Sequence, residues 1–583
     1  MGGFAGLLDR DAPRPEWSLG LEEPCFWADG LRLELRARST WAASPRFVVA
    51  LAGHFDRGHA AGQSAAEALL EAWERAGVGG LGTFDGAWVA MVFERASRRL
   101  HLIRDRFGIR RLYFSERGSR LAFATSPRHL LGLPWVSREL ARENLSEYLS
   151  FRYVHPPRTL LRDVQALPPG EQLVAEAATS RLERWYQLAY CQPYAAAPED
   201  QATLHELDRR MNRAVAARAS GKDRVAVFLS GGLDSSAIAW YASRLGPVST
   251  FTVGVEDAEE DETPYGSRVA TILGTEHTVR RINFSDFEAA FPKVVAAADF
   301  PVPDPAAIAQ YLLAVTAREH ADVILSGDGG DEIFGGRVAG AVASQLRLST
   351  WLGRLPGPLR LAAAAAFRGQ RPEIAEPSVP VGLARLIGGL QAFNRDERAE
   401  LLRDAGWVRE STRKRCLEPF YRELVSDPIN EILHVWLRGR MPGDGLARAG
   451  VAASLAGVGL REPLLDRDLV QFCAGIPGHW KVRTMPLGTI TKWPLRQLLK
   501  PVLGRAMVNR PKRVLPGPWA RWSTGPAAEF LQAKARQLRE DRLGLFRADA
   551  LDALLAAGLR GERTTQLWTL IFLDSWAQSM DVR

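Results

Sequence analysis

The stretch Val225-Ala-Val-Phe-Leu-Ser-Gly-Gly-Leu-Asp-Ser-Ser236 decides the fold of the chain around it. Its first five residues are apolar and predict a buried parallel strand. Ser230-Gly231-Gly232 then predicts a sharp turn, and residues 235–244 have the composition of a helix. A strand, a glycine turn and a helix N-terminus together form an anion site, because backbone N–H groups converge there. Glycines suit this turn because a Cβ would keep a phosphate away from the backbone.

The acidic residue in this loop, Asp234, indicates a metal ion. Its charge would repel a phosphate unless a cation lies between them, which points to Mg²⁺ shared with a nucleotide. The loop lacks the Gly-Lys-Ser/Thr of Walker sequences. It resembles the Ser-Gly-Gly-x-Asp-Ser loop of the ATP pyrophosphatases. That resemblance implies ATP as cofactor, cleaved between its α and β phosphates so that AMP is left on the substrate. The ATP-binding residues that it implies are Ser230, Gly231, Gly232, Asp234, Ser235 and Ser236.

A second motif, Ser326-Gly-Asp-Gly-Gly-Asp-Glu-Ile-Phe-Gly-Gly336, also combines glycines and carboxylates after an apolar segment. Its spacing does not fit an EF-hand calcium loop. Asp331 is expected to supply the second Mg²⁺ ligand opposite Asp234, with Asp328 in reach of the substrate as a catalytic candidate. The motif resembles Ser-Gly-Glu-Gly-x-Asp-Glu-x-Phe-Gly-Gly of the asparagine synthetases, a resemblance that covers nearly the whole chain. Two further ATP contacts are expected at Ser326 and Gly327.

Residues 200–583 are predicted to form an ATP pyrophosphatase domain with a doubly wound parallel sheet and additional helices. Strands alternate with helices, which is typical of such sheets and places ligands at the carboxyl ends of the strands. Leu229 and Val253 are expected at that edge, where adenine would lie against backbone groups. The predicted strands are 225–229, 247–253, 276–282 and 321–325, and the predicted helices are 201–219, 235–244, 264–273, 285–298 and 306–320.

Residues 1–190 read as a separate β-rich domain, followed by a Pro- and Ala-rich linker at 191–205. Strands are predicted at 47–51, 87–93, 100–103 and 120–124, with one helix at 64–76. The segment Asp105-Arg-Phe-Gly-Ile-Arg-Arg-Leu-Tyr-Phe114 resembles class II glutamine amidotransferase domains, as do Gly82–Trp88 and Leu167–Leu173. The resemblance implies an Ntn-type sandwich of two antiparallel sheets flanked by helices.

Several residues that such a domain needs for glutamine hydrolysis are replaced. The family's nucleophile is a cysteine after Met1, where this sequence has Gly2. Its Asn-Gly-Glu stretch corresponds to Ala52-Gly-His54, and Ala65 stands where the family's glutamine-binding Asp is expected. We therefore expect a retained scaffold without glutaminase activity.

The composition and net charge of the chain argue against several classes of protein. Of 583 residues, 46% are hydrophobic and 24% charged, as in ordinary globular proteins. Without a run of about eighteen apolar residues, a membrane partner is not expected. The N-terminus lacks signal-peptide features, and the four cysteines form no CxxC pair, which favours a cytoplasmic protein with reduced thiols. The net charge is +8, but no basic stripe interleaved with aromatic residues occurs, so nucleic-acid binding is not expected either.

Residues 441–466 align without gaps on the asparagine synthetase segment that holds the small substrate. The residues that shape its fold match, namely Pro442, Asp444, Leu446, Arg461, Pro463, Leu465 and Asp466, but the polar residues that face the small substrate do not. Gly450 and Val451 replace an Asp-Arg pair, and Gly459 replaces a Glu, for which Glu462 is a candidate catalytic substitute. Further on, Lys492-Trp-Pro-Leu-Arg496 resembles the family's Lys-x-x-Leu-Arg helix. By resemblance, Lys492 stabilises charge on the phosphate and on the oxyanion of the closing amide, and Lys512 is a weaker phosphate ligand.

Together these features predict an AMP-forming amide synthetase whose amine arrives with its substrate. The closest resemblance is to the lasso-peptide macrolactam synthetases, in which an adenylated Asp or Glu side chain is attacked by the peptide's own N-terminal amine. Tethering the two groups removes most of the entropic barrier. The implied partners are a precursor peptide, a leader peptidase and a leader-recognition protein. Three alternatives stay open: a β-lactam-type cyclising synthetase, an ammonia- or amine-using amide synthetase, and a binding scaffold without catalysis.

Overall fold

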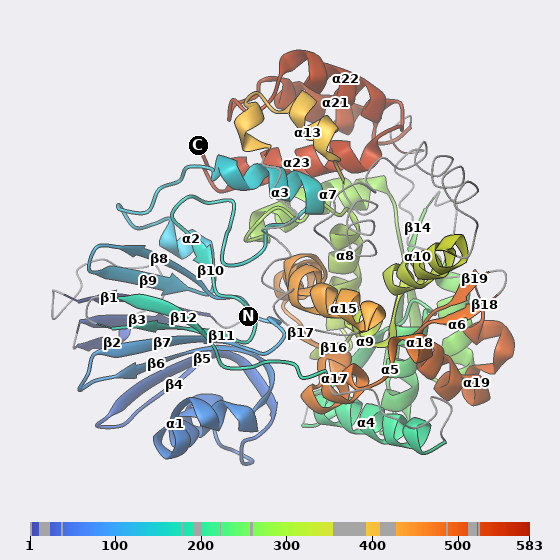
Figure 1. The fold of residues 1–583 in the computed structure, drawn as a ribbon, viewed down its shortest axis with the longest axis horizontal. Helices are drawn as coiled ribbons and strands as arrows, with labels where there is room; N and C mark the ends of the chain where they lie inside the picture. Colours follow the sequence, from blue (N-terminus) through green and yellow to red (C-terminus); the bar gives the residue numbers. More distant parts are fainter. Residues whose placement is uncertain are drawn as a thin grey trace.

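The computed structural model shows a β-sandwich beside a larger α/β part (Figure 1). It describes residues 3–10, 24–28, 30–36, 39–176, 179–190, 201–221, 223–256, 261–353, 392–408, 427–485, 488–510, 522 and 525–583. Both antiparallel sheets of the sandwich lie before residue 190, and the parallel sheet lies after residue 200. In this described part, no helix is long and apolar enough to cross a lipid bilayer.

The sandwich consists of two six-stranded antiparallel sheets, as the sequence predicts. Apolar side chains of the two sheets, such as Phe4, Val89 and Phe123, form the core between them. One sheet has the order β10 (Gln165–Ala166), β8 (Tyr113–Arg117), β9 (Arg120–Ala124), β1 (Phe4–Asp9), β3 (Leu31–Leu35) and β2 (Pro24–Ala28). The other has the order β12 (Ser180–Arg184), β11 (Glu171–Ala175), β7 (Arg99–Arg104), β6 (Asp85–Glu94), β5 (Phe47–Arg57) and β4 (Ser39–Ala43).

Helices flank the sandwich. The predicted helix at 64–76 is α1 (Ala65–Ala76), and Ser64 and Glu67 form a capping box at its start. Helix α1 covers the outer face of β4 and β5. A 3₁₀ turn (Gly77–Thr83) and the short α2 (Pro127–Leu130) follow. Helix α3 (Arg142–Phe151) reaches across to the C-terminal helices, where the Tyr148 hydroxyl donates a hydrogen bond to the Thr569 carbonyl oxygen (3.0 Å).

The α/β part is built on a five-stranded parallel sheet. Its order is β15 (Glu276–Ile282), β14 (Ser249–Val255), β13 (Val225–Phe228), β16 (Val323–Leu325) and β17 (Gly459–Arg461). Four of these strands match the predicted ones. The sequence did not predict β17, because three residues with a glycine carry too little pattern to be read as a strand.

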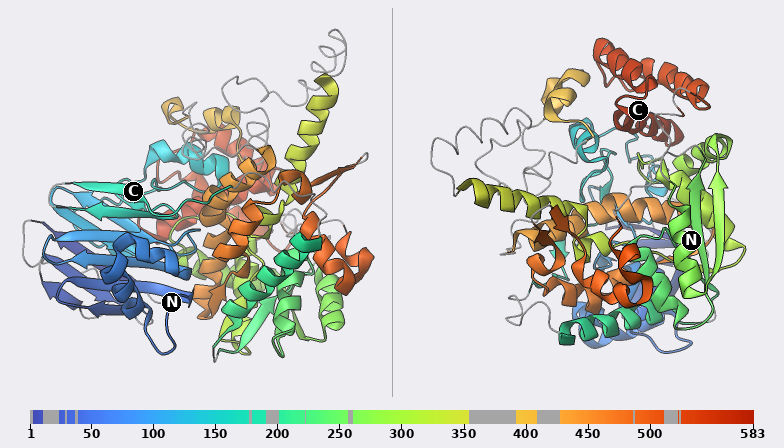
Figure 2. Two further views of the ribbon diagram at one scale, coloured as in Figure 1. Left: turned by 60° about the horizontal axis from the view of Figure 1, so that its bottom comes forward. Right: turned by 90° about the vertical axis from the view of Figure 1, so that its right-hand side faces the viewer.

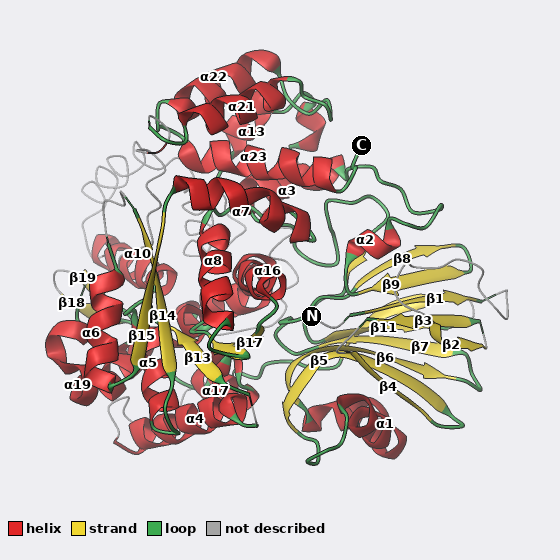
Figure 3. Ribbon diagram, turned by 180° about the vertical axis from the view of Figure 1, so that it is seen from behind, coloured by secondary structure: helices red, strands yellow, loops and turns green. Residues whose placement is uncertain are grey.

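Helices cover both faces of this sheet, which confirms the doubly wound fold (Figure 3). On one face, Ala226 and Ile324 pack against α8 (Ala306–Arg318) and α16 (Leu446–Ala456). On the other face, Val227 and Leu325 pack against α4 (Gln201–Ala219), α5 (Leu233–Ser243), α6 (Thr263–Leu273) and α19 (Trp493–Val508). Adjacent strand residues point to opposite faces, so both layers are apolar. Helix α7 (Phe284–Ala297) lies beside α8 and packs against the C-terminal helices.

The remaining elements are mostly helical (Figure 2). The short α9 (Gly330–Phe334) and α10 (Arg337–Gly353) follow β16. Within the region 337–430, predicted to be helical, α10 and α13 (Arg395–Leu401) agree, and the alanine run at 361–367 lies outside the described residues. The others are a 3₁₀ turn (Ala405–Trp407), α15 (Pro428–Val435), a π-helix (Trp436–Gly445), a 3₁₀ turn (Pro463–Leu465), α17 (Arg467–Ala474), α18 (Gly478–Lys481), the hairpin β18 (Arg483–Met485) and β19 (Gly488–Ile490), α21 (Ala528–Arg539), α22 (Ala548–Leu559) and α23 (Thr564–Ser579).

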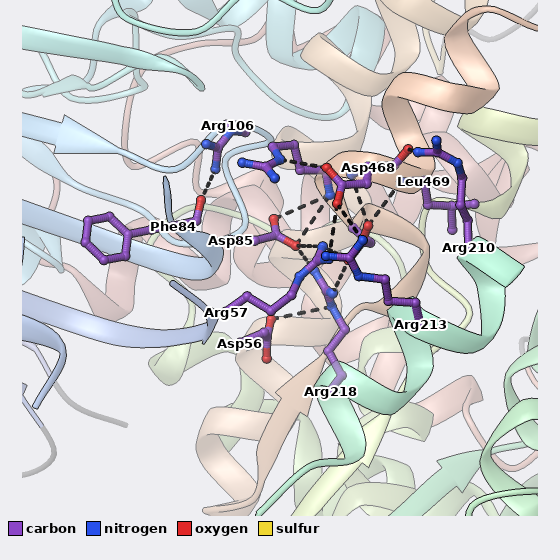
Figure 4. A network of polar contacts seen from close by, with 12 residues as sticks. Asp56, Arg57, Phe84, Asp85, Arg106, Arg210, Arg213, Arg218, Asp468 and Leu469 are labelled. Atoms are coloured by element: carbon purple, nitrogen blue, oxygen red, sulfur yellow. Dashed lines mark hydrogen bonds and ion pairs between the residues drawn. The ribbon is translucent and has the colours of Figure 1, made fainter. Parts of the chain in front are cut away.

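A buried network of charges joins the sandwich to the α/β part (Figure 4). Arg218 on α4 is 1% exposed and contacts three carboxylates. Its nitrogens lie 2.7 Å from Asp466, 2.9 Å from Asp85 and 3.4 Å from Asp56. Arg57 at the end of β5 also contacts Asp85 and Asp466. Charges from both parts thus neutralise each other at the interface. We call Asp56, Arg57, Asp85, Arg218 and Asp466 the interface network.

Replacing Arg218 should destabilise the protein strongly. Arg218→Met removes the arginine that contacts Asp56, Asp85 and Asp466 and leaves these buried carboxylates with too little positive charge, a change that typically costs about 3–5 kcal/mol. Arg209→Met on the same helix is the matched control, because Arg209 is exposed and pairs only with Glu206. Its effect should stay within about 0.5 kcal/mol. Urea unfolding of both variants measures the difference, and equal midpoints would contradict the role given to Arg218.

Candidate active site

A cleft of about 810 Å³ opens at the carboxyl ends of the parallel strands. Both sequence motifs contribute to its walls, together with the start of α19. Most predicted site residues line it: Leu229, Ser230, Gly231, Gly232, Asp234, Ser235, Val253, Ser326, Gly327, Asp328, Asp331 and Lys492. Ser236 and Glu462 are buried and are not among its lining residues. Lys512 lies outside the described residues.

The loop from Ser230 to Gly232 has the geometry that the sequence predicts for a phosphate site. Gly231 has φ +69°, and a Cβ there would collide with the backbone of Tyr265 at 2.6 Å. The Ser230 and Ser235 hydroxyls lie 3.1 Å apart and brace the turn. Arg510 donates to the Gly231 carbonyl oxygen (3.2 Å) and stacks on Tyr265. The loop is therefore held in a fixed shape at the start of α5, as anion binding requires.

The second motif packs directly onto this loop, and its glycines allow the close approach. A Cβ on Gly327 would lie 2.9 Å from the Ser235 nitrogen. A Cβ on Gly330 would overlap the Asp234 carboxylate, and one on Gly336 would overlap Asp331. Glycine is needed at these positions because any larger residue would push the two carboxylates apart.

Lys492 joins the two predicted metal ligands. Its ammonium group contacts the Asp234 carboxylate and lies 2.5 Å from Asp331 Oδ1. Burial would lower the pKa of Lys492, but the two carboxylates outweigh burial and raise it above its usual range. The residue is at the start of α19 with φ +55°, a left-handed conformation that its backbone bond to the Gly335 carbonyl helps to hold. The lysine therefore stays charged between the carboxylates.

The arrangement fits a Mg²⁺ ion shared with a nucleotide. Mg²⁺ is commonly held by one or two carboxylates together with substrate phosphates. Asp234 and Asp331 meet at Lys492, and Asp234 Oδ1 is buried without a hydrogen-bond partner among the described residues. No group of three or more potential metal ligands occurs in the described part of the chain. Two carboxylates would therefore hold the ion only with phosphate oxygens present.

Two further carboxyl groups lie close together next to the loop. Burial raises the pKa of Asp328, although Arg448 opposes the rise. Burial also raises the pKa of Glu462 to about 8, with Arg110 opposing and Asp328 adding to the rise. Glu462 is therefore protonated at neutral pH, and it is buried outside the cleft lining, near enough to Asp328 for the charge of Asp328 to act on it.

The glycine at position 459 says little about the substrate, although it aligns with a Glu of the family. It pairs with Val323 at the start of β16, whereas the cleft lies past the other end of that strand. A Cβ there would point at Val323 and the Asp322 carbonyl oxygen. A carboxylate at this position would point away from the cleft, so the glycine at 459 does not argue against the β-lactam alternative.

The sequence also failed to predict a group of arginines in the cleft. We expected residues 450–459 to lack the family's polar substrate groups, and these arginines lie outside that stretch. Six arginines and two tryptophans line the cleft: Arg152, Arg337, Arg440, Arg448, Arg496, Arg510, Trp436 and Trp568. Because the chain contains many arginines, few of these could have been singled out from the sequence. The one local signal is that Trp436, Arg440 and Arg448 are separated by multiples of four residues.

Comparison with known proteins identifies the family. Residues 206–578 match the asparagine synthase family, and residues 53–186 match a glutamine amidotransferase domain. The chain belongs to the asparagine synthase family. The match supports an ATP-dependent amide synthetase similar to asparagine synthase.

Relatives within the asparagine synthase family differ in what their names state. A Mycobacterium tuberculosis protein, named provisionally as a glutamine-hydrolyzing asparagine synthetase, is 28% identical over 88% of this chain and 79% of its own length. Bacillus subtilis glutamine-hydrolyzing asparagine synthetase 1 is 27% identical over 84% of this chain and 77% of its own. Amidase chyE of Penicillium rubens is 24% identical over 82% and 75%. At these identities the family is shared, while the substrate is not determined.

Adding a side chain where the two motifs pack together should reduce turnover strongly without unfolding the protein. Gly330→Ala would force the Asp234 carboxylate away from Asp331. A displacement of about 1 Å in such a site can cost roughly 10²-fold in rate. Gly450→Ala is the matched control, since no atom lies within 4 Å of its added Cβ. The measurement is ATP-dependent turnover with circular dichroism of both variants. Normal activity in Gly330→Ala would show that the close approach is not required.

The buried proton on Glu462 should make stability depend on pH. Because its folded-state pKa is about 8 and its unfolded value about 4.5, folding takes up a proton between these values. Stability then falls as pH rises through this range, by at most about 1.4 kcal/mol per pH unit. Glu462→Gln imitates the protonated form and should remove the fall. Melting temperatures from pH 5 to pH 8 test this, and parallel curves for the two proteins would refute it.

Proposed function

We propose that the protein is a lasso-type peptide macrolactam synthetase. It would activate an Asp or Glu side chain of a precursor peptide with ATP and close a ring with the peptide's N-terminal amine. The observation that carries this proposal is a division between the two parts of the chain. Most of the expected ATP-binding residues meet in one cleft, whereas the stretch that corresponds to the family's Asn-Gly-Glu leads into the interface network through Asp56 and Arg57.

That division supports a substrate that brings its own amine. Ala52 and Ala65 offer no polar side chain to glutamine, and Asp56 and Arg57 contact charges of the other part. A domain used in this way stabilises the interface but does not release ammonia. An amine tethered to the activated carboxylate needs no second binding site, and its effective concentration is high.

The reaction is a two-step amide synthesis. A carboxylate oxygen of the peptide attacks the α-phosphorus of ATP, the bond to the β-phosphate breaks, and pyrophosphate leaves. The N-terminal amine then attacks the acyl carbon, AMP leaves and the amine loses a proton. Mg²⁺ held by Asp234 and Asp331 would neutralise phosphate charge. Lys492 stabilises the negative charge that develops in both steps, which is the type of contribution that commonly lowers barriers most.

Asp328 and Glu462 are the proposed acid–base groups. Asp328 lines the cleft, and Glu462 lies behind it as a neutral carboxyl that can exchange a proton with it. Asp328 would receive the proton that the amine loses, while Leu229 and Val253 would contact the adenine. The expected partners are the precursor peptide, a protease that exposes its N-terminus and a protein that binds its leader. The location would be the cytoplasm.

Mass spectrometry of a leader-free core peptide tests the proposal. The peptide encoded by a neighbouring precursor gene, incubated with enzyme, ATP and Mg²⁺, should lose the mass of one water. AMP should form in equal amount, and fragmentation should place the new bond between the α-amine and an Asp or Glu side chain. Asp234→Asn should abolish both products. Arg209→Met should not change them, because Arg209 lies exposed on the outer surface of α4.

Three outcomes would refute the proposal. Efficient conversion of free aspartate with ammonia, while peptides stay unchanged, would indicate an amide synthetase of the ordinary kind. Ring closure of a small β-amino acid would indicate the β-lactam alternative. Glutamate formed from glutamine above an enzyme-free control would show that the N-terminal domain does supply ammonia.

A further inference from the structure

On one wall of the cleft, charged and aromatic side chains contact one another in a row. Arg440 stacks on Trp436 with its guanidinium 4.3 Å from the ring centre. Arg440 also lies 3.3 Å from the Asp444 carboxylate, and Arg448 lies 3.9 Å from its other oxygen. Arg152, from the end of α3, approaches Asp444 to 3.9 Å. We call Arg152, Trp436, Arg440, Asp444 and Arg448 the arginine ladder.

The backbone beneath the ladder is unusual. Residues 436–445 form a π-helix that contains Pro442, and π-helical segments are rare and frequent at functional sites. The sandwich part braces it. Arg111 donates to the Pro442 carbonyl oxygen (3.1 Å), and Tyr153 packs so closely on Gly443 that a Cβ there would overlap its ring. The ladder is thus fixed by contacts from the other part of the chain.

The hydrogen-bond donors of the arginine ladder indicate an anionic ligand. Three arginines share the buried Asp444, whose pKa burial would raise but the arginines lower to about 2. Arg448 also pairs with Asp304 at 2.6 Å. Arg448 Nε is nevertheless buried and has no hydrogen-bond partner among the described residues. The three arginines face Asp444 and Asp304, and the charge of Arg448 also acts on Asp328. Within the described part of the chain the Arg448 Nε is still unused, and burying such a donor is costly unless a ligand accepts from it.

We propose that the arginine ladder binds a carboxylate of the substrate and that Arg448 makes the direct contact. This inference rests on the proposed function, which it deepens by assigning the residues that select an acidic group. In the proposed site ATP would take the glycine loop and Lys492, which stand on other elements. Arg448 is held by ion pairs with Asp304 and Asp444, and a planar guanidinium held in this way can match a carboxylate in two parallel hydrogen bonds. Arg448 is also the cation that acts most strongly on Asp328.

A pair of small probes tests the inference without a known peptide. N-acetylglutamate α-methylamide carries a single carboxylate, and N-acetylglutamine α-methylamide is its neutral counterpart. Each is titrated into the full-length protein with Mg²⁺ and α,β-methylene-ATP, which cannot be cleaved at the α–β position. Saturation-transfer NMR measures binding. The wild-type protein should prefer the carboxylate probe by roughly tenfold or more, as expected for a charged, bidentate hydrogen bond.

Variants assign the preference to the ladder. Arg448→Met should reduce the preference to less than about threefold, and Arg448→Lys should keep part of it, because lysine retains the charge but not the paired geometry. Affinity for the ATP analogue should be unchanged in both. Arg209→Met, the exposed control, should behave as the wild type does. Equal binding of the two probes to the wild type overturns the inference, and so does a loss of ATP-analogue affinity in Arg448→Met, which would assign the ladder to phosphate.

The experiment separates this inference from the proposed function. If the core peptide is not cyclised but the Arg448-dependent preference is present, the cyclase proposal fails and the carboxylate site stands. If the peptide is cyclised with the same KM and kcat by Arg448→Met, the carboxylate site fails and the cyclase proposal stands. If both hold, Arg448→Met should raise KM for the peptide more than it lowers kcat.

Discussion

The contact of Lys492 with Asp234 and Asp331 is the interaction on which the site depends. Two carboxylates at the ends of neighbouring strands would repel each other in a partly buried cleft, and the ammonium group between them compensates this charge. The contact is possible only because glycines 327, 330 and 336 let one motif pack on the other. It also ties α19, far along the chain, to the start of α5. Fold and chemistry are therefore specified by the same few residues.

The interface network gives the N-terminal part a role that does not require glutamine hydrolysis. Arg218 and Asp466 belong to the α/β part, while Asp56, Arg57 and Asp85 belong to the sandwich. Asp466 begins α17 and follows the segment that contains Glu462, so the network fixes the position of a proposed acid–base group. Arg111 and Tyr153 brace the π-helix in the same way. Loss of the sandwich would therefore affect the synthetase site directly.

The sequence predicted the parts of this structure that repeat a local pattern. The alternation of strands and helices from 201 to 325 was correct to within two or three residues, because long amphipathic and apolar segments carry strong signals. The loop residues Ser230 to Ser235 and Asp331 were also found, since their spacing is set by local backbone geometry. What the sequence missed depends on contacts between distant segments. Strand β17 and the interface network arise from tertiary packing that no local window contains, and so does the approach of Arg152 to the rest of the arginine ladder, which lies within residues 436–448.

Activation and selection of the substrate are placed on separate elements. ATP chemistry uses the strand ends and α19, whereas the ladder stands on the π-helix and α16, which the sandwich supports. Residues 450 and 451, where the family's polar pair is missing, lie on α16 just after Arg448. Arg448 stands two residues before the first of these positions, so α16 keeps a charged side chain on a different side of the helix from the family's pair. A carboxylate-bearing molecule would then meet its charged contact in a different place, while the residues expected to bind ATP stay where the parallel sheet fixes them.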